Sequence, residues 1–180
     1  MIFNREGLLL VGEESERLLF RKVTDADFAT WLTFCEEEDA LKYIFSKEDQ
    51  LLTPIQKCEK WFEKVNNRYE NSLGGMNALI EKETGNLVGQ CGLLIQTIDG
   101  VEELEIGYSL LKDFRGKGFA IEAASKCKDF AIKNKLSDSL ISVIIPENLS
   151  SIAVAEKNRM TKEKITIQHG DSVAIYRISI

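Results

Sequence analysis

The sequence predicts an α/β (α+β) protein with a mixed, largely antiparallel sheet of about seven strands and helices on both faces. Three observations predict this fold class. A strand pattern near the N-terminus is followed by two helix patterns, and the middle of the chain is a run of strand patterns joined by short turns. The last third alternates helix and strand patterns and closes with a hairpin pattern. Strands joined by short turns pair antiparallel, whereas helices between strands cover the faces of the sheet.

The first elements are a strand over 17–23 (RLLFRKV) and two helices with recognisable starts. TDAD at 24–27 is a typical helix start, and TPIQ at 53–56 combines an N-cap Thr53, a proline at the first helical position and Gln56 at the third. Apolar residues then recur at helical spacing, in the first helix as Phe28, Trp31, Leu32 and Cys35 and in the second as Ile55, Cys58, Phe62, Val65 and Tyr69. We expect Trp31 and Trp61 to be core residues, with a place in a groove wall as the alternative.

The remaining elements are mostly strands. Residues 76–96 read as a hairpin with its turn at TGN, and 98–110 adds a strand after Asp99-Gly100. A helix follows from 118 to about 133, with Phe119, Ala123, Cys127, Phe130 and Ala131 on its apolar face. The chain ends with a short apolar strand (139–146), a helix (150–158) and a hairpin (164–180) whose turn contains QHGD.

Length and composition favour one soluble, globular domain over 1–180. The chain is 44% hydrophobic and 29% charged, and its net charge of −6 argues against general nucleic-acid binding. No apolar run approaches the ~20 residues that span a bilayer. The first 14 residues lack a basic segment followed by a long apolar one, so we expect no signal peptide and a cytoplasmic location. A monomer and a homodimer both remain open.

The cysteines do not have the spacing of a metal site. Cys35, Cys58, Cys91 and Cys127 are separated by more than twenty residues each, with no CxxC pair, and the single His169 lies in the QHGD turn. We therefore expect buried or partly buried thiols and no metal.

A basic, glycine-containing loop precedes the helix at 118–133. KDFRGKGFAIEAA at 112–124 places Lys112, Arg115 and Lys117 with two glycines in seven residues. A Walker-type phosphate loop fails because Phe119-Ala120 follows Gly118. A GxGxxG fingerprint is a weak match, because Ile121 stands where glycine or alanine belongs. The pattern R-x-x-G-x-A is met at every position, and successive N–H groups of such a loop can hold a pyrophosphate. A plain strand-to-helix connection is the alternative.

This loop resembles the acyl-CoA-binding segment of the GCN5-related N-acetyltransferase (GNAT) superfamily, within its ribosomal-protein N-terminal (Rim-type) branch. The first strand and helix of that branch are resembled by ESERLLFRKVTDADFATWL. Its fourth strand and CoA loop are resembled by ELEIGYSLLKDFRGKGFAIEAA, and its fifth strand and Asn-x-x-Ser motif are resembled by IPENLSSIAVAEKN. The resemblance implies one N-acetyltransferase domain over 1–180, a V-shaped splay between the fourth strand (104–110) and the fifth (140–146), and acetyl-CoA as co-substrate. The family places backbone donors of the fourth strand, the loop and the Asn-x-x-Ser motif around CoA. By resemblance the CoA-binding residues are Ile106, Gly107, Tyr108, Leu110, Arg115, Gly116, Lys117, Gly118, Phe119, Ala120, Asn148 and Ser151. Asn148 could also be a helix N-cap.

The resemblance also implies direct attack of a primary amine on the acetyl group in a ternary complex. A carboxylate must take the proton of the amine, and Glu103 and Glu105 occupy one face of the fourth strand where the family often places such a base; a solvent-facing role is the alternative for both. Ser151 is the candidate for protonating the thiolate of CoA; the alternatives are water as the proton source and a structural role for Ser151 as a helix-start hydroxyl. The acceptor is a protein N-terminus or a small amine. The segment 35–50, with six carboxylates against two lysines, would attract a cationic one unless it is simply a solvated surface.

Two points stay open at this stage. A CoA-binding sensor or interaction module without transferase activity is the rival function. The family usually ends the helix after the Asn-x-x-Ser motif with Lys-apolar-Gly-Phe, whereas this chain has Lys157-Asn158-Arg159-Met160. Without that glycine the helix loses its usual left-handed end, for which Asn158 is a candidate, and the far wall of the acceptor site is left open.

Overall fold

The computed structural model describes residue 5 and residues 7–180, and in this part of the chain seven strands form one sheet in the order β1-β2-β3-β4-β5-β7-β6. The strands are β1 (Leu18–Lys22), β2 (Gly74–Glu81), β3 (Leu87–Ile98), β4 (Val101–Leu110), β5 (Ser139–Ile144), β6 (Thr161–Gln168) and β7 (Asp171–Ser179). The helices are α1 (Phe28–Cys35), α2 (Glu38–Leu41), α3 (Pro54–Glu70), α4 (Phe119–Lys133) and α5 (Leu149–Lys157), with 3-10 turns η1 (Asp25–Asp27), η2 (Asp49–Leu51) and η3 (Lys112–Phe114). Neighbouring strands are antiparallel except β4 and β5, which are parallel, so the predicted mixed sheet is confirmed.

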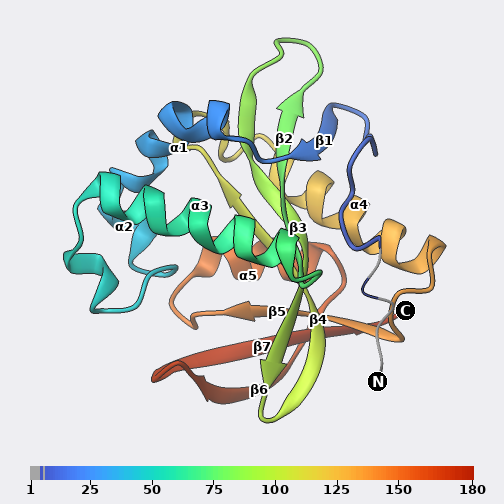
Figure 1. Cartoon of the computed structure of the whole chain (residues 1–180). Coiled ribbons are helices and arrows are strands. Elements are labelled where there is room, and N and C mark those ends of the chain that lie inside the picture. The colour runs from blue at the N-terminus through green and yellow to red at the C-terminus, as the bar shows by residue number, and fades with distance from the viewer. Residues whose placement is uncertain (1–4, 6) are drawn as a thin grey trace.

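Helices cover both faces of the sheet, as predicted (Figure 1). On one face, α1 and α3 pack together in one hydrophobic cluster, which includes the fully buried Trp31 of α1. On the other face, α4 packs through Phe119, Ala123 and Cys127 against the strands in a second cluster. Both clusters contain residues of β2 and β3, so these two strands lie between the helical layers.

Both helix starts read from the sequence are present. Thr24 and Asp27 form a reciprocal capping box at η1, which leads directly into α1. At α3 the Thr53 hydroxyl accepts from the Gln56 N–H, and the Gln56 side chain accepts from the Thr53 N–H at 2.9 Å. These local interactions satisfy N–H groups that the first helical turn cannot pair.

The end of α5 differs from the prediction. Asn158 is the C-cap with φ −79°, and Arg159 takes the left-handed conformation at φ +67°. The Met160 N–H donates to Ala155 O at 3.0 Å and the Arg159 N–H to Glu156 O at 2.9 Å, which is a Schellman motif. Asn158, the candidate for this position, is therefore not the left-handed residue. Its buried side chain instead donates to Ala124 O and accepts from Ser125 Oγ, both on α4.

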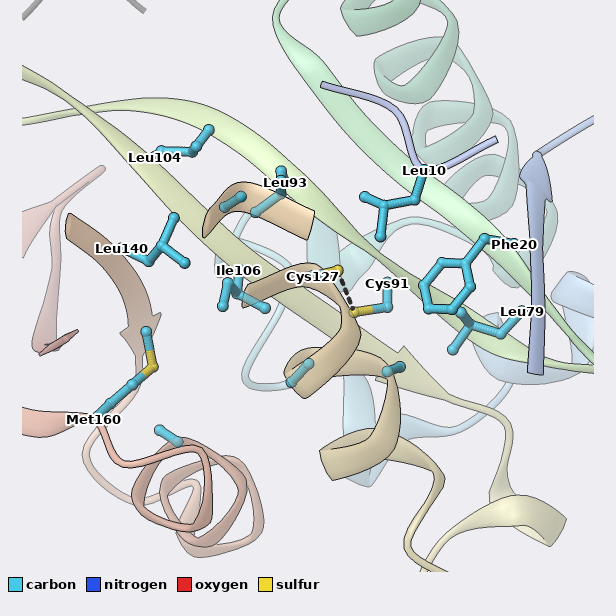
Figure 2. Packing of buried hydrophobic residues seen from close by; sticks show 14 of the residues in the cluster. Leu10, Phe20, Leu79, Cys91, Leu93, Leu104, Ile106, Cys127, Leu140 and Met160 are labelled. Carbon is cyan, nitrogen blue, oxygen red and sulfur yellow. Dashed lines mark hydrogen bonds between the residues drawn. The ribbon is translucent and has the colours of Figure 1, made fainter. Parts of the chain in front are cut away.

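All four cysteines are buried, as expected. Cys91 of β3 and Cys127 of α4 lie with their sulfur atoms 3.5 Å apart in the core (Figure 2). Within residue 5 and residues 7–180, no three or more His, Cys, Asp or Glu side chains are grouped to hold a metal ion. In the same residues, no helix combines the length and the apolar character needed to cross a bilayer.

Two segments fold in ways that the sequence patterns did not predict. Before β1, Leu8 and Leu10 are buried in the cluster beneath α4, and the Leu10 N–H donates to the buried Asn77 Oδ1. The acidic segment 35–50 contains α2 and turns back so that Tyr43 and Phe45 face the sheet across a cavity. This second segment helps to form the candidate site.

Candidate active site

The parallel strands β4 and β5 are paired at one position only, Glu105 with Ile141, and then diverge. Beyond this bridge the Ser142 hydroxyl donates to Ile106 O at 2.9 Å, so a side chain replaces the next backbone hydrogen bond. The diverging strands leave a cavity of about 300 Å³ that continues into a wider opening of about 1000 Å³. We call the two together the V cleft. Its inner walls include Tyr43, Phe45, Trp61, Lys64, Arg68, Gln96, Glu105, Ile106, Gly107, Tyr108, Ser142, Val143, Asn148 and Ser151. The splay expected between the fourth and fifth strands is therefore present.

Glu105 lies at the apex of the V cleft, at the last paired position of β4. The side chain is buried, with 9% of its surface exposed. One carboxylate oxygen accepts from Gln96 Nε2 at 2.7 Å, and the other from the Val143 N–H at 3.4 Å. Burial raises the pKa of this carboxyl, while these hydrogen bonds and the positive charges of Arg68 and Lys64 oppose the rise. The arrangement provides a carboxylate whose proton affinity is raised and which opens into the cleft.

The orientation of the Gln96 amide is fixed by its two neighbours. Arg68, a donor only, gives a hydrogen bond from Nη2 to Gln96 Oε1 at 3.2 Å, so the amide nitrogen must face Glu105. Arg68 is itself buried and held by Leu73 O and Ile95 O, both at 3.1 Å from Nη1. Sequence reasoning missed Gln96 and Arg68, since no motif contains them.

Glu103 differs from Glu105 in its surroundings, because it is ion-paired. Glu103 accepts two hydrogen bonds from Arg177 of β7, at 2.7 Å and 3.0 Å. In the part of the chain that the structure describes, it is not one of the residues that line the V cleft. Glu103 and Glu105 share one face of β4 as predicted, but only Glu105 opens into the cavity.

The basic loop has the backbone geometry that a phosphate-binding nest requires. Gly116 and Gly118 have φ of +72° and +85°, a conformation that favours glycine. Gly118 is the N-cap of α4. Within residue 5 and residues 7–180, the N–H groups from Gly116 to Ile121 make no hydrogen bond of good geometry to a protein acceptor. These N–H groups, with the Lys117 side chain, are available to an anion.

Two arginines hold the loop in place. The Arg115 guanidinium donates to Leu110 O and pairs with Glu37 at 2.8 Å, and the Arg115 N–H donates to Lys112 O. Arg17, which sequence reasoning missed, donates to Lys117 O at 3.0 Å, pairs with Glu122 at 2.7 Å and stacks on the Phe119 ring. Arg115 therefore shapes the loop through protein contacts.

The other predicted CoA-binding residues fall into two groups. Asn148 and Ser151 line the cavity, and Asn148 is also the N-cap of α5, where its Oδ1 accepts from the Ser151 N–H at 3.2 Å. The Tyr108 hydroxyl crosses from β4 and donates to Ser151 O at 2.8 Å. The residues that do not line the cavity include Leu110 and Phe119, which are buried in the core, and Ala120, which packs against it.

Comparison with known proteins supports these assignments of fold and family. Residues 17–161 match the acetyltransferase (GNAT) domain family. The chain is 30% identical over 164 residues to the uncharacterized protein YkkB of Bacillus subtilis, covering 90% of this chain and 92% of that protein. It is 25% identical over 171 residues to an uncharacterized N-acetyltransferase, p20, of Bacillus licheniformis, covering 92% and 93%.

Solved structures show the same fold. An acetyltransferase from Agrobacterium tumefaciens is 23% identical with a TM-score of 0.74, covering 93% of this chain and 94% of that one. RimJ of Mycobacterium smegmatis, solved with CoA-disulfide, is 15% identical with a TM-score of 0.73, covering 90% and 81%. A spermidine N-acetyltransferase from Vibrio cholerae, solved with CoA and spermine, is 16% identical with a TM-score of 0.70, covering 91% and 95%. The chain therefore belongs to the acetyltransferase (GNAT) family and is an N-acetyltransferase that depends on acetyl-CoA.

Proposed function

We propose that the V cleft binds acetyl-CoA between β4 and β5 and transfers the acetyl group directly to a primary amine in a ternary complex. The diverging strands support this, because past the Glu105–Ile141 bridge β5 no longer pairs with β4. The pantetheine arm can pair there as an added strand. The loop N–H groups from Gly116 to Ile121 suit the pyrophosphate, and the RimJ and spermidine acetyltransferase structures were solved with CoA-type ligands.

In this proposal the backbone at Ile106–Tyr108 faces the acetyl carbonyl. Ile106 O points toward β5, since it accepts from Ser142, and residues two apart along a strand direct their backbone groups to the same side. The Tyr108 N–H then also points into the V cleft. A fixed N–H at this place stabilises the negative charge that develops on the carbonyl oxygen during attack.

The single observation that carries the catalytic assignment is the buried carboxylate of Glu105 at the apex of the cavity. Glu105 takes the proton of the acceptor ammonium, directly or through a water, and the neutral amine attacks the acetyl carbon. The nitrogen then gives up its second proton, the carbon–sulfur bond breaks and the CoA thiolate leaves. That second proton balances the one that the thiolate gains, and a hydroxyl group or water can relay it. The raised pKa of Glu105 strengthens it as a base, while Gln96 and Val143 keep its oxygens aligned.

The departing thiolate takes a proton or a hydrogen bond from a hydroxyl group beside α5. Ser151 lines the cavity, one helical turn beyond Asn148. The Tyr108 hydroxyl, which donates to Ser151 O, is a second candidate that the sequence patterns did not show.

The test is acetyl-CoA-dependent thiol release with N-terminal peptides and small amines as acceptors. Transfer to any primary amine supports the proposed direct acetyl transfer. Binding of CoA in calorimetry without transfer to any acceptor would instead support a CoA-binding sensor or interaction module. A cytoplasmic location is part of the proposal, because acetyl-CoA must be at hand.

A further inference from the structure

The inner part of the V cleft carries more positive than negative charge, although the chain as a whole is acidic. Its charged wall residues are Asp49, Lys60, Lys64, Arg68 and Glu105. Asp49 and Lys60 neutralise each other in an ion pair at 2.5 Å. This leaves Lys64 and Arg68 against the single carboxylate of Glu105.

The acidic segment 35–50 does not correct this imbalance. Of its six carboxylates, only Asp49 lines the cleft. Glu37 pairs with Arg115 at 2.8 Å, and Asp39 is fully exposed beside Lys42 at 3.7 Å. The segment faces the cavity with Tyr43 and Phe45 instead. The charge run visible in the sequence therefore does not make the cleft negative.

Neither Lys64 nor Arg68 has an ion-pair partner within residue 5 and residues 7–180. The Arg68 guanidinium is used on neutral acceptors, two backbone carbonyls and the Gln96 amide. The Lys64 side chain lines the cleft and remains accessible to solvent through its opening. Partial desolvation in the cleft and the like charge of Arg68 lower the pKa of Lys64. When Glu105 takes the proton of the amine, its negative charge is lost and both cations remain uncompensated.

We propose that the acceptor is a primary amine that also carries a carboxylate, such as an amino acid or a peptide with an acidic residue next to its N-terminus. Lys64 forms the ion pair with that carboxylate, and the buried charge of Arg68 strengthens the field there. Tyr43, Phe45 and Trp61 supply the apolar walls along which the rest of the acceptor lies. The proposal rests on the proposed acetyl transfer and names its substrate class.

The experiment measures thiol release by the full chain with three peptides that differ only at the second residue, Glu, Gln or Lys. Free glutamate and spermidine serve as small-molecule acceptors, so the panel separates peptides from amino acids. We expect kcat/KM to fall from Glu to Gln to Lys by about tenfold at each step, as for a close charge pair in a partly desolvated site. Lys64→Met should remove the preference for Glu, and Lys64→Glu should reverse it. The KM for acetyl-CoA should stay unchanged in both variants.

Lys133→Met, an exposed lysine at the end of α4 outside the cleft, is the matched control and should leave the preference intact. Equal or faster reaction of the Lys peptide or spermidine would overturn the proposal, as would a preference for Glu that survives Lys64→Met. Calorimetry with acetyl-CoA distinguishes a failure of the proposed function from a failure of this substrate class, because a protein that does not bind acetyl-CoA gives no heat of binding. Binding of acetyl-CoA with no transfer to any carboxylate-bearing amine would also refute this substrate class.

Discussion

Replacing the carboxylate at the apex of the cleft, Glu105→Gln, tests the chemical step most directly. The substitution keeps the size of the side chain and removes its ability to take a proton. Its surroundings predict a small structural effect as well. Gln96 Nε2 and the Val143 N–H are both donors, so a glutamine can accept from only one of them. We expect the shorter hydrogen bond, from Gln96, to persist, because Arg68 prevents the Gln96 amide from turning.

The expected size of the effect depends on the acceptor amine. An α-amino group with an ordinary pKa of about 7.8 is roughly one-seventh neutral at pH 7 and almost wholly neutral at pH 9. Without a base, only the neutral fraction reacts. The ratio of variant to wild-type kcat/KM should therefore rise about sevenfold between pH 7 and pH 9 for such an acceptor. A general base typically contributes about 10²–10⁴-fold, so much of the loss should remain at pH 9.

In the wild-type enzyme, Glu105 should also determine the acidic side of the pH–activity profile. Glu105 must be ionised to act as a base, and burial raises its pKa above the ordinary 4.5. Activity should fall as the pH drops through this raised pKa, so the acidic limb lies at a higher pH than an exposed glutamate would give. In Glu105→Gln this limb should disappear.

The assay is thiol release at saturating acetyl-CoA from pH 5 to pH 9.5, with the melting temperature measured at each pH. Glu103→Gln, two residues away on the same strand, is the matched control. It breaks the ion pair with Arg177 and should change stability without changing the shape of the pH profile. A constant ratio of variant to wild type across the pH range, in a folded Glu105→Gln protein, would show that Glu105 is not the base.

Three further substitutions give separate tests. Gly118→Val should abolish the rise in melting temperature that acetyl-CoA produces, because a β-branched residue is strained at φ +85° and covers the N–H groups of the loop. The control is Gly85→Val, at φ +73° in the β2–β3 turn. It carries the same strain and should keep the rise in melting temperature on adding acetyl-CoA. Ser151→Ala should lower kcat by about tenfold with little change in CoA affinity, and a larger loss in Tyr108→Phe than in Ser151→Ala would assign proton donation to the phenol instead. Arg159→Gly should stabilise the protein by about 1 kcal/mol, or roughly 2–4 °C in thermal unfolding, because glycine takes the left-handed position without strain; an unchanged melting temperature would contradict this.

Much of the fold could be predicted because its signals are local. The capping box of Thr53 and Gln56 involves residues three apart, and the strands of the central meander are joined by short turns. The R-x-x-G-x-A loop is equally local, and its two glycines have the positive φ values that the pattern requires. Local rules of this kind operate within one or two helical turns or one hairpin, so they can be read without knowing the tertiary structure.

The parts of the site that escaped prediction depend on residues far apart in the chain. Strand alternation places Glu103 and Glu105 on one face, but Arg177, which pairs with Glu103, is 74 positions from it. Arg17 is 100 positions from Lys117, whose carbonyl it holds. Gln96 lies opposite Glu103 in the register of β3 and β4 and reaches Glu105 diagonally, so its contact depends on a pairing that the sequence alone does not give. Long-range pairing of this kind leaves no periodic signal in the sequence.

The single bridge between β4 and β5 links the fold to the proposed chemistry. Because pairing stops at Glu105, its carboxylate lies at the apex of the cleft, and the next acceptor on β4, Ile106 O, would be left without a partner inside the protein. Ser142, itself buried, supplies that partner through its hydroxyl. The strands can therefore separate without leaving Ile106 O unpaired. An unpaired buried carbonyl would cost about 1–3 kcal/mol of stability. On the proposed mechanism, the same separation leaves the Tyr108 N–H to the acetyl group, so one serine hydroxyl makes the opening of the sheet compatible with its stability.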